Sequence, residues 1–472
     1  MKKFYAMPVL ALLCGMMCIG CASDDFAEVV EQPKEKVVTL KTSITLGDVT
    51  SRFLTADGKK TFTEGEKIAV VYSIKSGHRI ESESDSLCAK DINNNGKDAE
   101  FTVKLTNPLS GGDFMIIYPS KMVKEKKNIF QGEFPVNYSR LISQDGTLKT
   151  IAQELDYSMY VGKYSEPNEH PVIFTLENQL AILKLTIRDG DKKDITGSIK
   201  RLTILNDTNR YVISNSSQNV IYVAMRPVNK EQTIKFKATD GVKLYVKEVS
   251  GKELQAGKIY PIYLTVNEAE PDIQAVDLGL SVKWANMNLG ANVETDKGLM
   301  FAWGETIGYS SSDFSDHKFA WENYKWGQEE SLTKYNSNSY KGIVDNKKSL
   351  EPEDDAATME YGSSWRMPTK SEFEELFTSN KIRSREYVKN YNESGVDGWL
   401  ITALNGKSIF LPYAGNRRDY LRDSKEQGFY WTSTLISKDV SKAYYGRCDG
   451  SSNIIHDGLP RYRGMSIRAV KP

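Results

Sequence analysis

The chain lacks several features that mark common classes of enzyme and nucleic-acid-binding protein. It has 472 residues but only four histidines, at positions 78, 170, 317 and 456, and none forms a close pair of the HExxH kind. No G-x-S-x-G elbow, G-x-G-x-x-G fingerprint or Walker loop occurs. Lys+Arg and Asp+Glu both number 62, so the formal net charge is zero, and the charge gives no sign of a nucleic-acid partner.

Cysteine is also scarce outside the N-terminal region. Of the five cysteines, three lie at positions 14, 18 and 21, and only Cys88 and Cys448 remain in the body of the chain. These two fall in parts of the sequence that we interpret as different domains, which excludes a disulfide framework. The folded domains must therefore be held together by burial of apolar surface.

The first 20 residues have the pattern of a signal peptide. Lys2 and Lys3 precede an apolar run from Met7 to Ile19, which is too short to span a bilayer. We therefore exclude residues 1–20 from the predicted fold.

The end of this segment, "CIGC" at 18–21, resembles the lipobox of bacterial lipoproteins, although Cys18 stands where that family prefers leucine. The resemblance implies that Cys21 receives diacylglycerol and palmitate and anchors the chain in the outer membrane. Ser23-Asp24-Asp25 resembles the acidic tag that directs lipoproteins of Bacteroidota-type bacteria to the cell surface. The alternative is ordinary secretory cleavage with Cys21 left free.

After a tether at 21–36, the sequence becomes rich in β-strand patterns. Short apolar or alternating runs are separated by Gly, Asn and Asp, and no long helical periodicity precedes residue 270. The spacing is that of all-β sandwiches, and "KYSEPNEH" at 163–170 interrupts it. We predict a mainly β fold with one sandwich over 37–165 and a second over 166–268.

Four segments of this region resemble landmarks of the fimbrillin superfamily. They are "TSR" at 50–52, "FTEGEKIAV" at 62–70, "FTLENQLAILKLTI" at 174–187 and "LQAGKIYPIYLTV" at 254–266. The resemblance implies a surface lipoprotein with two transthyretin-like sandwiches that assembles into fimbriae with other subunits by strand exchange. In that family an Arg-specific protease removes the first strand, and Arg52 stands where such a cut would fall. The alternative is that Arg52 is an ordinary exposed loop residue.

One segment has part of a calcium-binding pattern. "DINNNG" at 91–96 matches the first half of an EF-hand loop, but the twelfth position is Thr102 in place of the bidentate Glu. Asn and Gly before the strand pattern "AEFTVKL" are typical of a hairpin turn. We predict a turn and no metal.

The region after the linker at 267–274 has a different composition. Six of the seven tryptophans lie between 284 and 399, and the seventh is Trp431. Together with "FAWGE", "WRMPT", "FLPYAGNRRD" and "GFYWTST", these residues resemble C-type-lectin-like domains, which are distantly akin to the sulfatase-modifying-factor fold. The resemblance implies an α+β C-type-lectin-like domain over 273–472.

Within this domain, "SSWRMPTKSEFEEL" at 363–376 predicts a helix. Thr369 can serve as the N-cap, with Glu372 closing a capping box, and Phe373, Leu376 and Phe377 form one apolar face. We predict that this face packs in the core. A ligand role for Arg366 or Glu372 is the alternative.

The motifs of catalysis are missing from this domain. Formylglycine-generating relatives need a pair of active-site cysteines, and here only Cys448 occurs. The calcium-site pattern of C-type lectins is also absent, since "EPN" at 166–168 falls in another domain and "WEN" at 321–323 only approaches WND. We therefore expect no enzyme and no cofactor, although pairs of carboxylates brought together by folding stay open.

Aromatic faces and paired polar groups suit sugar ligands, which gives two candidate surfaces. The alternative for each residue is a place in the core or on the solvated surface. The candidates are Trp321, Tyr324 and Trp326, and Asn416, Arg417 and Asp419.

Three functions remain open from the sequence. The first is a fimbrial adhesin, at the tip, in which the C-terminal domain is a head that contacts a host or bacterial surface glycan or protein. The second is a non-fimbrial surface lipoprotein that binds glycans. The third is an enzyme on a sulfatase-modifying-factor-like scaffold.

Overall fold

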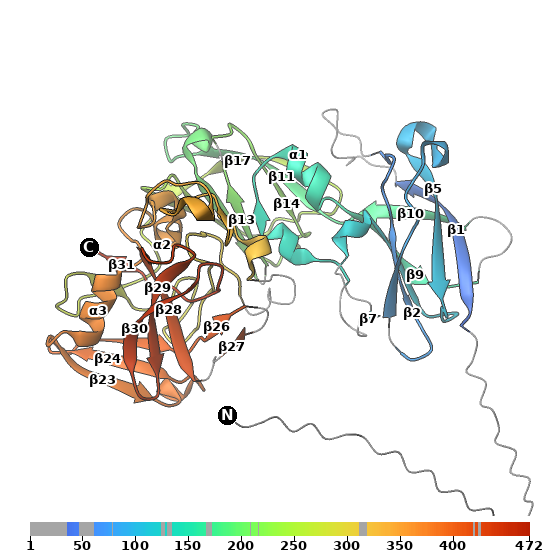
Figure 1. Cartoon of the computed structure of the whole chain (residues 1–472). Coiled ribbons are helices and arrows are strands. Elements are labelled where there is room, and N and C mark those ends of the chain that lie inside the picture. Colours follow the sequence, from blue (N-terminus) through green and yellow to red (C-terminus); the bar gives the residue numbers. More distant parts are fainter. Residues whose placement is uncertain are drawn as a thin grey trace, which may run out of the picture.

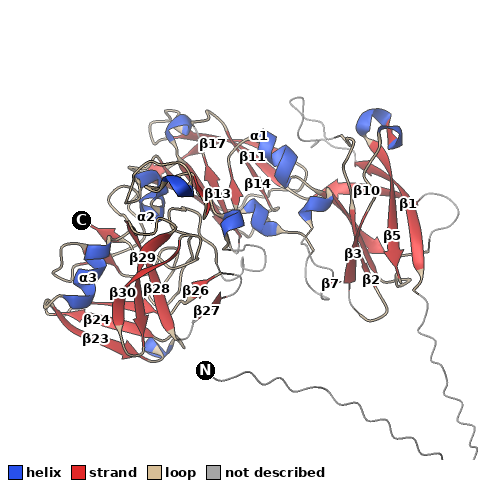
Figure 2. Ribbon diagram, viewed as in Figure 1, coloured by secondary structure: helices blue, strands red, loops and turns tan. Residues whose placement is uncertain are grey.

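The computed structural model describes residues 35–46, 61–77, 79–123, 135–166, 172–207, 209–215, 217–310, 319–418 and 426–472, and the strands at 128–129 and 421–422. The fold is mainly β, as predicted, and Figures 1 and 2 show two sandwiches followed by a C-terminal domain. Cys21 and Arg52 lie outside the described residues. No helix in the described ranges is long and apolar enough to cross a membrane.

The first sandwich has two layers that close on one core. Strands β4, β5, β1 and β10 form one layer, and β9, β6, β2, β3 and β7 form the other. Leu40 and Ile44 of one layer share a buried cluster with Val70 and Phe114 of the other. The strands are β1 (Val37–Leu46), β2 (Ala69–Ser73), β3 (Arg79–Glu83), β4 (Ile92–Asn93), β5 (Asp98–Thr106), β6 (Asp113–Tyr118), β7 (Asn128–Ile129), β9 (Ser158–Lys163) and β10 (Val172–Asn178).

Strand β10 corrects the predicted boundary between the sandwiches. The prediction places 172–178 in the second sandwich, but Val172–Leu176 pair in parallel with Thr42–Leu46 of β1. The alternation of apolar residues predicts that a strand forms, and it does not tell which sheet the strand joins.

The second sandwich pairs a three-stranded sheet, β14-β11-β17, with a six-stranded sheet, β18-β16-β15-β12-β13-β8. The segment 141–157, which the prediction assigns to the first sandwich, contributes β8 and the buried Leu141, Ile151 and Leu155 to this core. The elements are β8 (Ser143–Gln144), α1 (Leu148–Thr150), the π-helical turn Ile151–Leu155, β11 (Ala181–Arg188), β12 (Arg201–Asn206), β13 (Asn209–Ser214), β14 (Ile221–Met225), β15 (Ile234–Thr239), β16 (Leu244–Val249), β17 (Ile259–Thr265) and β18 (Asn267–Glu268).

The two sandwiches share apolar packing across β2. Ala69, Val70, Val71 and Tyr72 are all fully buried, a pattern expected of a strand covered on both faces. Val70 and Tyr72 belong to the core of the first sandwich, whereas Ala69 and Val71 belong to the cluster that includes the core of the second. The sandwiches are therefore packed against each other and are not strung on a free linker.

The C-terminal domain begins and ends in one small sheet, because β20 pairs with both β19 and the last strand, β31. The fully buried rings of Trp284, Trp303 and Trp431 lie in its core. Its elements are β19 (Ala275–Val276), β20 (Lys283–Ala285), β21 (Gly327–Gln328), β22 (Ser331–Leu332), α2 (Ala356–Tyr361), α3 (Lys370–Thr378), β23 (Ile382–Val388), β24 (Gly398–Ala403), β25 (Ser408–Pro412), β26 (Asn416–Arg417), β27 (Leu421–Arg422), β28 (Gln427–Leu435), β29 (Lys442–Asp449), β30 (Asn453–Pro460) and β31 (Val470–Lys471).

The helix predicted after "WRMPT" is α3. Thr369 is its N-cap, and both hydrogen bonds of the capping box with Glu372 are present. Phe373, Leu376 and Phe377 are buried, as predicted. This helix is thus an architectural element, which packs against the sheet of β28, β29 and β30.

The segment with the partial calcium pattern is the predicted turn. Ile92 and Asn93 of β4 pair with Ala99 and Asp98 of β5 across a short connection in which Asn94 and Asn95 have φ of 48° and 54°. Asn94 Nδ2 donates to Asp98 Oδ2 at 3.1 Å. The asparagines therefore provide left-handed backbone and a local hydrogen bond.

Candidate functional site

Strand β1 is the candidate site on the first sandwich, because the first of the described strands lies inside its sheet. From Val37 to Thr45 it pairs antiparallel with β5, and from Thr42 to Leu46 it pairs in parallel with β10. Among the described strands, β1 alone lies between β5 and β10. Removal of β1 would thus open a slot with unpaired backbone groups on both walls, which is a template for another strand.

The inward side chains of β1 fill part of the core. Leu40, Ile44 and Leu46 are 2%, 0% and 5% exposed, and burial of such side chains is worth about 1.5–3 kcal/mol each. Thr42 is also buried, and its Oγ1 donates to the carbonyl oxygen of Val172 at 2.9 Å. A strand that replaced β1 would need apolar side chains and one small hydroxyl at these registers.

At the other end of the sandwich pair, β17 is the edge strand of its sheet and is paired on one side within the described residues. β17 pairs in parallel with β11 over seven residues, from Ile259 to Thr265. The chain then crosses to the other sheet, where Asn267 and Glu268 of β18 pair with Val246 and Tyr245. Part of the linker predicted at 267–274 is therefore ordered in a sheet. The chain is paired with one sheet before it crosses, through β17, and with the other sheet after it crosses, through β18.

The C-terminal domain docks on the second sandwich through a buried carboxylate. Glu360 of α2 accepts a hydrogen bond from Arg201 of β12 at 2.9 Å, with Lys237 at 3.7 Å and Arg210 at 3.9 Å. Burial alone would raise the pKa of Glu360, but Arg201, Lys237 and Arg210 hold it below its ordinary value. The carboxylate is therefore charged at neutral pH and compensated entirely by residues of another domain.

Further contacts surround this ion pair. Arg201 and Arg210 donate to the carbonyl oxygens of Thr306 and Gly308, each at 2.7 Å, and the amide of Ser363 donates to Val242 at 3.2 Å. Ile142 packs in a cluster that otherwise belongs to the C-terminal domain. These contacts hold the C-terminal domain in a fixed position beside β13 (Figure 1), with α2 against β15.

Of the aromatic candidates for ligand contact, Tyr324 lies in the core. It is 6% exposed, its hydroxyl donates to the Trp303 carbonyl at 2.6 Å, and it accepts from Arg461 Nε at 2.9 Å. Both functions of the hydroxyl are thus engaged inside the domain, and Tyr324 does not face a ligand in this structure.

The two tryptophan candidates are half-buried. Trp321 packs edge-on against Tyr324 and Tyr462, with ring centroids 5.6 and 5.1 Å apart. Trp326 donates its indole N–H to the Gly304 carbonyl at 2.8 Å, and the Lys325 ammonium lies over its ring at 4.2 Å. Each keeps part of its ring at the surface and part in the domain.

The second group of candidates is only partly described. Asn416 and Arg417 are 4% and 7% exposed, and Asn416 Oδ1 accepts from Arg463 at 3.1 Å. The Arg417 amide donates to the Gly464 carbonyl at 2.8 Å, which fixes β26 against the core. Asp419 lies outside the described residues. Burial of Asn416 and Arg417 speaks for a structural role in both cases.

The remaining residues that could bind a ligand or take part in chemistry are paired within the protein or buried alone. Arg366 binds Glu372 through two hydrogen bonds, of 2.8 and 2.5 Å. Cys448 is a buried free thiol, and burial raises its pKa well above the ordinary range. Among the described residues, no group of three or more His, Cys, Asp or Glu side chains is arranged to hold a metal ion.

Sequence reasoning missed the docking of the C-terminal domain. Arg201 and Glu360 are 159 positions apart in the chain, and each is an ordinary charged residue in its local pattern. A strand residue of one domain and a helix residue of another carry no sequence signal of their contact, so only the folded arrangement reveals the pair.

Comparisons with known proteins give structural likenesses only. No family model matches the chain, and no curated protein matches it. Among solved structures, it is similar to a fimbrial assembly protein from Parabacteroides distasonis, at 12% identity and a TM-score of 0.30, over 48% of this chain and 91% of that one. It is also similar to the minor pilin of Streptococcus agalactiae, at 11% identity and a TM-score of 0.21, over 50% of this chain and 100% of that one. Likenesses at this level do not carry a function across.

Proposed function

We propose that the chain is a terminal subunit of a cell-surface fimbrium, with the C-terminal domain as its outward head. The observation that carries the proposal is the place of β1, the first of the described strands, between β5 and β10. The covalent chain connects β1 to the rest of the sandwich through the C-terminal end of the strand. One cut after β1 therefore leaves the other described strands intact. The fimbrillin-like pattern of the sequence agrees with this role.

The first sandwich is the accepting end in this proposal. A cut at Arg52 would leave β1 held only by its ladders and by the buried Leu40, Ile44 and Leu46, worth roughly 5–9 kcal/mol of apolar burial. An incoming strand recovers the same contacts, so the exchange itself has little net cost in free energy once β1 can leave. We propose that the incoming strand carries apolar residues at the registers of Leu40, Ile44 and Leu46, and Ser or Thr at that of Thr42.

The second sandwich cannot donate a strand in the same way. β17 is paired along its whole length with β11, and β18 continues in the opposite sheet. The C-terminal domain that follows is docked through Glu360 and Arg201. Release of β17 would therefore require the docked domain to separate, and a subunit with one usable end terminates an assembly.

The same cut would change how the chain is held at the cell. The proposed lipid on Cys21 and the proposed cut at Arg52 lie on either side of β1, so the anchor would separate from the two sandwiches when β1 leaves the cut chain. An anchored precursor at the outer membrane and a processed subunit in the fimbrium are then successive states of one chain.

For the head we propose binding of a surface ligand and no catalysis. The half-buried Trp321 and Trp326 keep part of their rings at the surface, which suits contact with sugars or with protein. The single buried Cys448 does not suit thiol chemistry, because burial keeps the thiol protonated.

Immunogold labelling of isolated fimbriae with an antibody against the C-terminal domain tests the proposal. We expect gold at fimbrial ends, and we expect an Arg52→Ala chain to stay with the cell envelope and to leave the fimbriae unlabelled. Cells that lack the chain provide the control for the antibody. Gold spaced regularly along the shaft would overturn the terminal position, and no gold on fimbriae at all would overturn the fimbrial role.

A further inference from the structure

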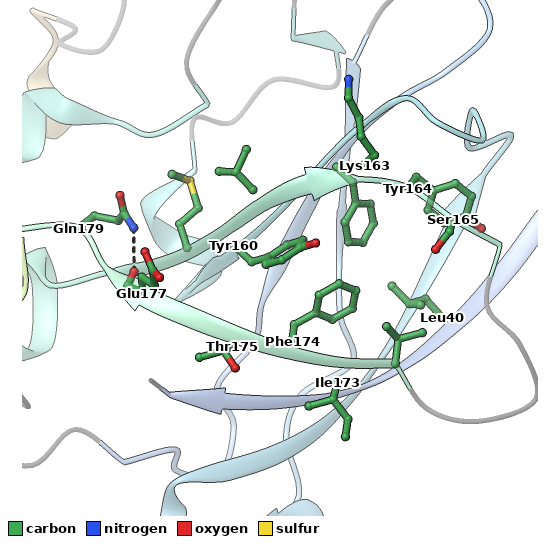
Figure 3. Close-up of a pocket in the computed structure, with 14 residues that line it drawn as sticks. Leu40, Tyr160, Lys163, Tyr164, Ser165, Ile173, Phe174, Thr175, Glu177 and Gln179 are labelled. Carbon is green, nitrogen blue, oxygen red and sulfur yellow. Dashed lines mark hydrogen bonds between the residues drawn. The ribbon is translucent and has the colours of Figure 1, made fainter. Parts of the chain in front are cut away.

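A second opening in the first sandwich lies between β9 and β10. These strands follow one another and run antiparallel, but they pair only where Ser158 and Met159 meet Asn178 and Glu177. Beyond this point β9 stays with β6, whereas β10 turns away to pair with β1. A cavity of about 690 Å³ opens between them, and we call it the β9–β10 cleft (Figure 3).

Within the described residues, both walls of the cleft present unpaired backbone groups. The Gln179 amide donates to the Tyr157 carbonyl at 3.1 Å, which sets the alternation of hydrogen-bonding direction along both strands. Every second residue from this pair points its N–H and C=O toward the opposite wall. Within the described residues, no strand pairs with the cleft-facing edge beyond Met159 and Glu177. The backbone groups that face the cleft belong to Val161, Lys163, Ile173 and Thr175.

The inner face of the cleft is aromatic. Tyr160 of β9 and Phe174 of β10 reach toward each other, with ring centroids 4.8 Å apart (Figure 3). The ring of Tyr160 lies over Gly162, where any side chain would overlap it. Tyr164 is 4% exposed, and its buried hydroxyl has no hydrogen-bond partner in the part of the chain that the structure describes. The cleft thus has an apolar floor with one unsatisfied hydroxyl.

The outer face of the same walls is apolar too. Val161 and Ile173 are 58% and 72% exposed and stand on opposite sides of the opening. Such exposure of β-branched residues beside a free strand edge is a pattern that proteins usually avoid, because it invites another strand.

We infer that the β9–β10 cleft binds an extended segment of another polypeptide, which pairs with the free edge of β9. The main chain of this segment would form hydrogen bonds with the cleft-facing N–H and C=O groups of Val161 and Lys163. Its alternate side chains would contact Tyr160 and Phe174 on the inner face and Val161 and Ile173 on the outer face, so consecutive apolar residues fit best. The paired charges at the rim, Lys163 with Asp113, favour a segment without net charge.

This site differs from the slot of β1, since it is open while β1 is in place. It does not depend on a cut at Arg52. A small ligand could cover the rings but would leave the row of backbone groups unpaired, which is why an extended peptide is the occupant that the cleft suits.

Hydrogen–deuterium exchange of the full, uncut chain tests the inference. The probe is the peptide acetyl-Lys-Thr-Val-Val-Val-Thr-Glu-amide, which has no net charge, and the matched control is the same peptide with alternate backbone nitrogens methylated so that it cannot pair. We expect exchange at Val161, Lys163 or both to slow at least tenfold with the first peptide and to stay unchanged with the second.

Two variants locate the effect. Ile173→Asp should weaken the peptide at least tenfold, because it places a charge on the apolar outer face. Ile343→Asp changes an isoleucine of similar exposure, 64%, in the C-terminal domain and should leave binding unchanged. Absence of binding at millimolar peptide, slowed exchange confined to other strands, equal binding of the methylated peptide, or binding unchanged by Ile173→Asp would each overturn the inference. A glucose oligosaccharide that changes the signals of Tyr160 and Tyr164 while no peptide slows an amide would also overturn the inference, since the cleft would then be a sugar site.

Discussion

The docking of the C-terminal domain depends on the charge of Glu360, and Glu360→Gln removes that charge at constant volume. The side chains of Glu360 and Arg201 are 12% and 3% exposed, so the change leaves a buried guanidinium with the Thr306 carbonyl but without its counter-charge. Breaking a buried pair in this way costs about 3–5 kcal/mol. Because glutamine keeps one hydrogen-bond acceptor, we expect the lower figure, about 3 kcal/mol, which is about a hundredfold in the docking equilibrium.

The amide of Ser363 reports this equilibrium directly, since it donates across the interface to the Val242 carbonyl. Its hydrogen exchange should accelerate about a hundredfold in Glu360→Gln if opening is fast and reversible. Glu268→Gln is the matched control, because Glu268 pairs with Lys243 on the open surface, at side-chain exposures of 58% and 50%. A Ser363 amide that exchanges equally in the wild type and in Glu360→Gln would refute the reasoning, and an equal acceleration in Glu268→Gln would show that the effect is not that of the buried pair.

Three further predictions concern the same domain and its interface. The charged form of Glu360 stabilises docking and its pKa is lowered, so docking should hold above the ordinary carboxyl range near pH 4.5 and weaken as pH falls through the lowered value. A radius of gyration from X-ray scattering that stays constant as the pH falls below the ordinary carboxyl range, until the domains themselves unfold, would contradict this. Tyr324→Phe leaves Arg461 Nε without its acceptor and should lower the free energy of unfolding of the C-terminal domain by about 1–3 kcal/mol. Ligand binding by the head should not change. Lost binding at unchanged stability would show that Tyr324 contacts the ligand and is not a core residue. Thr369→Ala should cost about 1 kcal/mol through loss of the cap of α3, with Thr369→Ser as the control that retains it; equal stability of all three chains would exclude a contribution of the cap.

Tryptophan fluorescence suits the last two measurements. All seven tryptophans lie in the C-terminal domain, at 284, 303, 321, 326, 365, 399 and 431. Unfolding followed at these residues therefore reports that domain and is silent on the two sandwiches.

Local chemistry made part of the fold predictable. The start of α3 follows from residues within one turn, because Thr369 and Glu372 satisfy each other's backbone and Phe373 begins the buried face. The turn after Ile92 is equally local, since asparagine tolerates left-handed backbone. In both cases the interaction that decides the structure lies within a few positions of the chain.

Partners distant in the chain were not predictable in the same way. β10 has the alternation of a strand, yet its partner β1 lies more than a hundred positions earlier, and nothing in the pattern names it. Tyr324 illustrates a second limit, since an aromatic residue with a polar tip suits a ligand site and a hydrogen-bonded core equally well. Glu360 illustrates a third, because its partners are on another domain.

Replacement of β1 is the central claim, and strand exchange in a cut chain tests it most directly. A specific protease site in place of residues 50–54 allows one cut after β1, and native mass spectrometry then follows the noncovalently held fragment. We predict that the cut chain retains β1 and exchanges it for an isotope-labelled peptide of residues 37–46, that a labelled peptide with Ile44→Asp does not enter, and that the uncut chain takes up neither. A cut chain that loses β1 and unfolds, or one that keeps it and never takes up the labelled peptide, would contradict the claim.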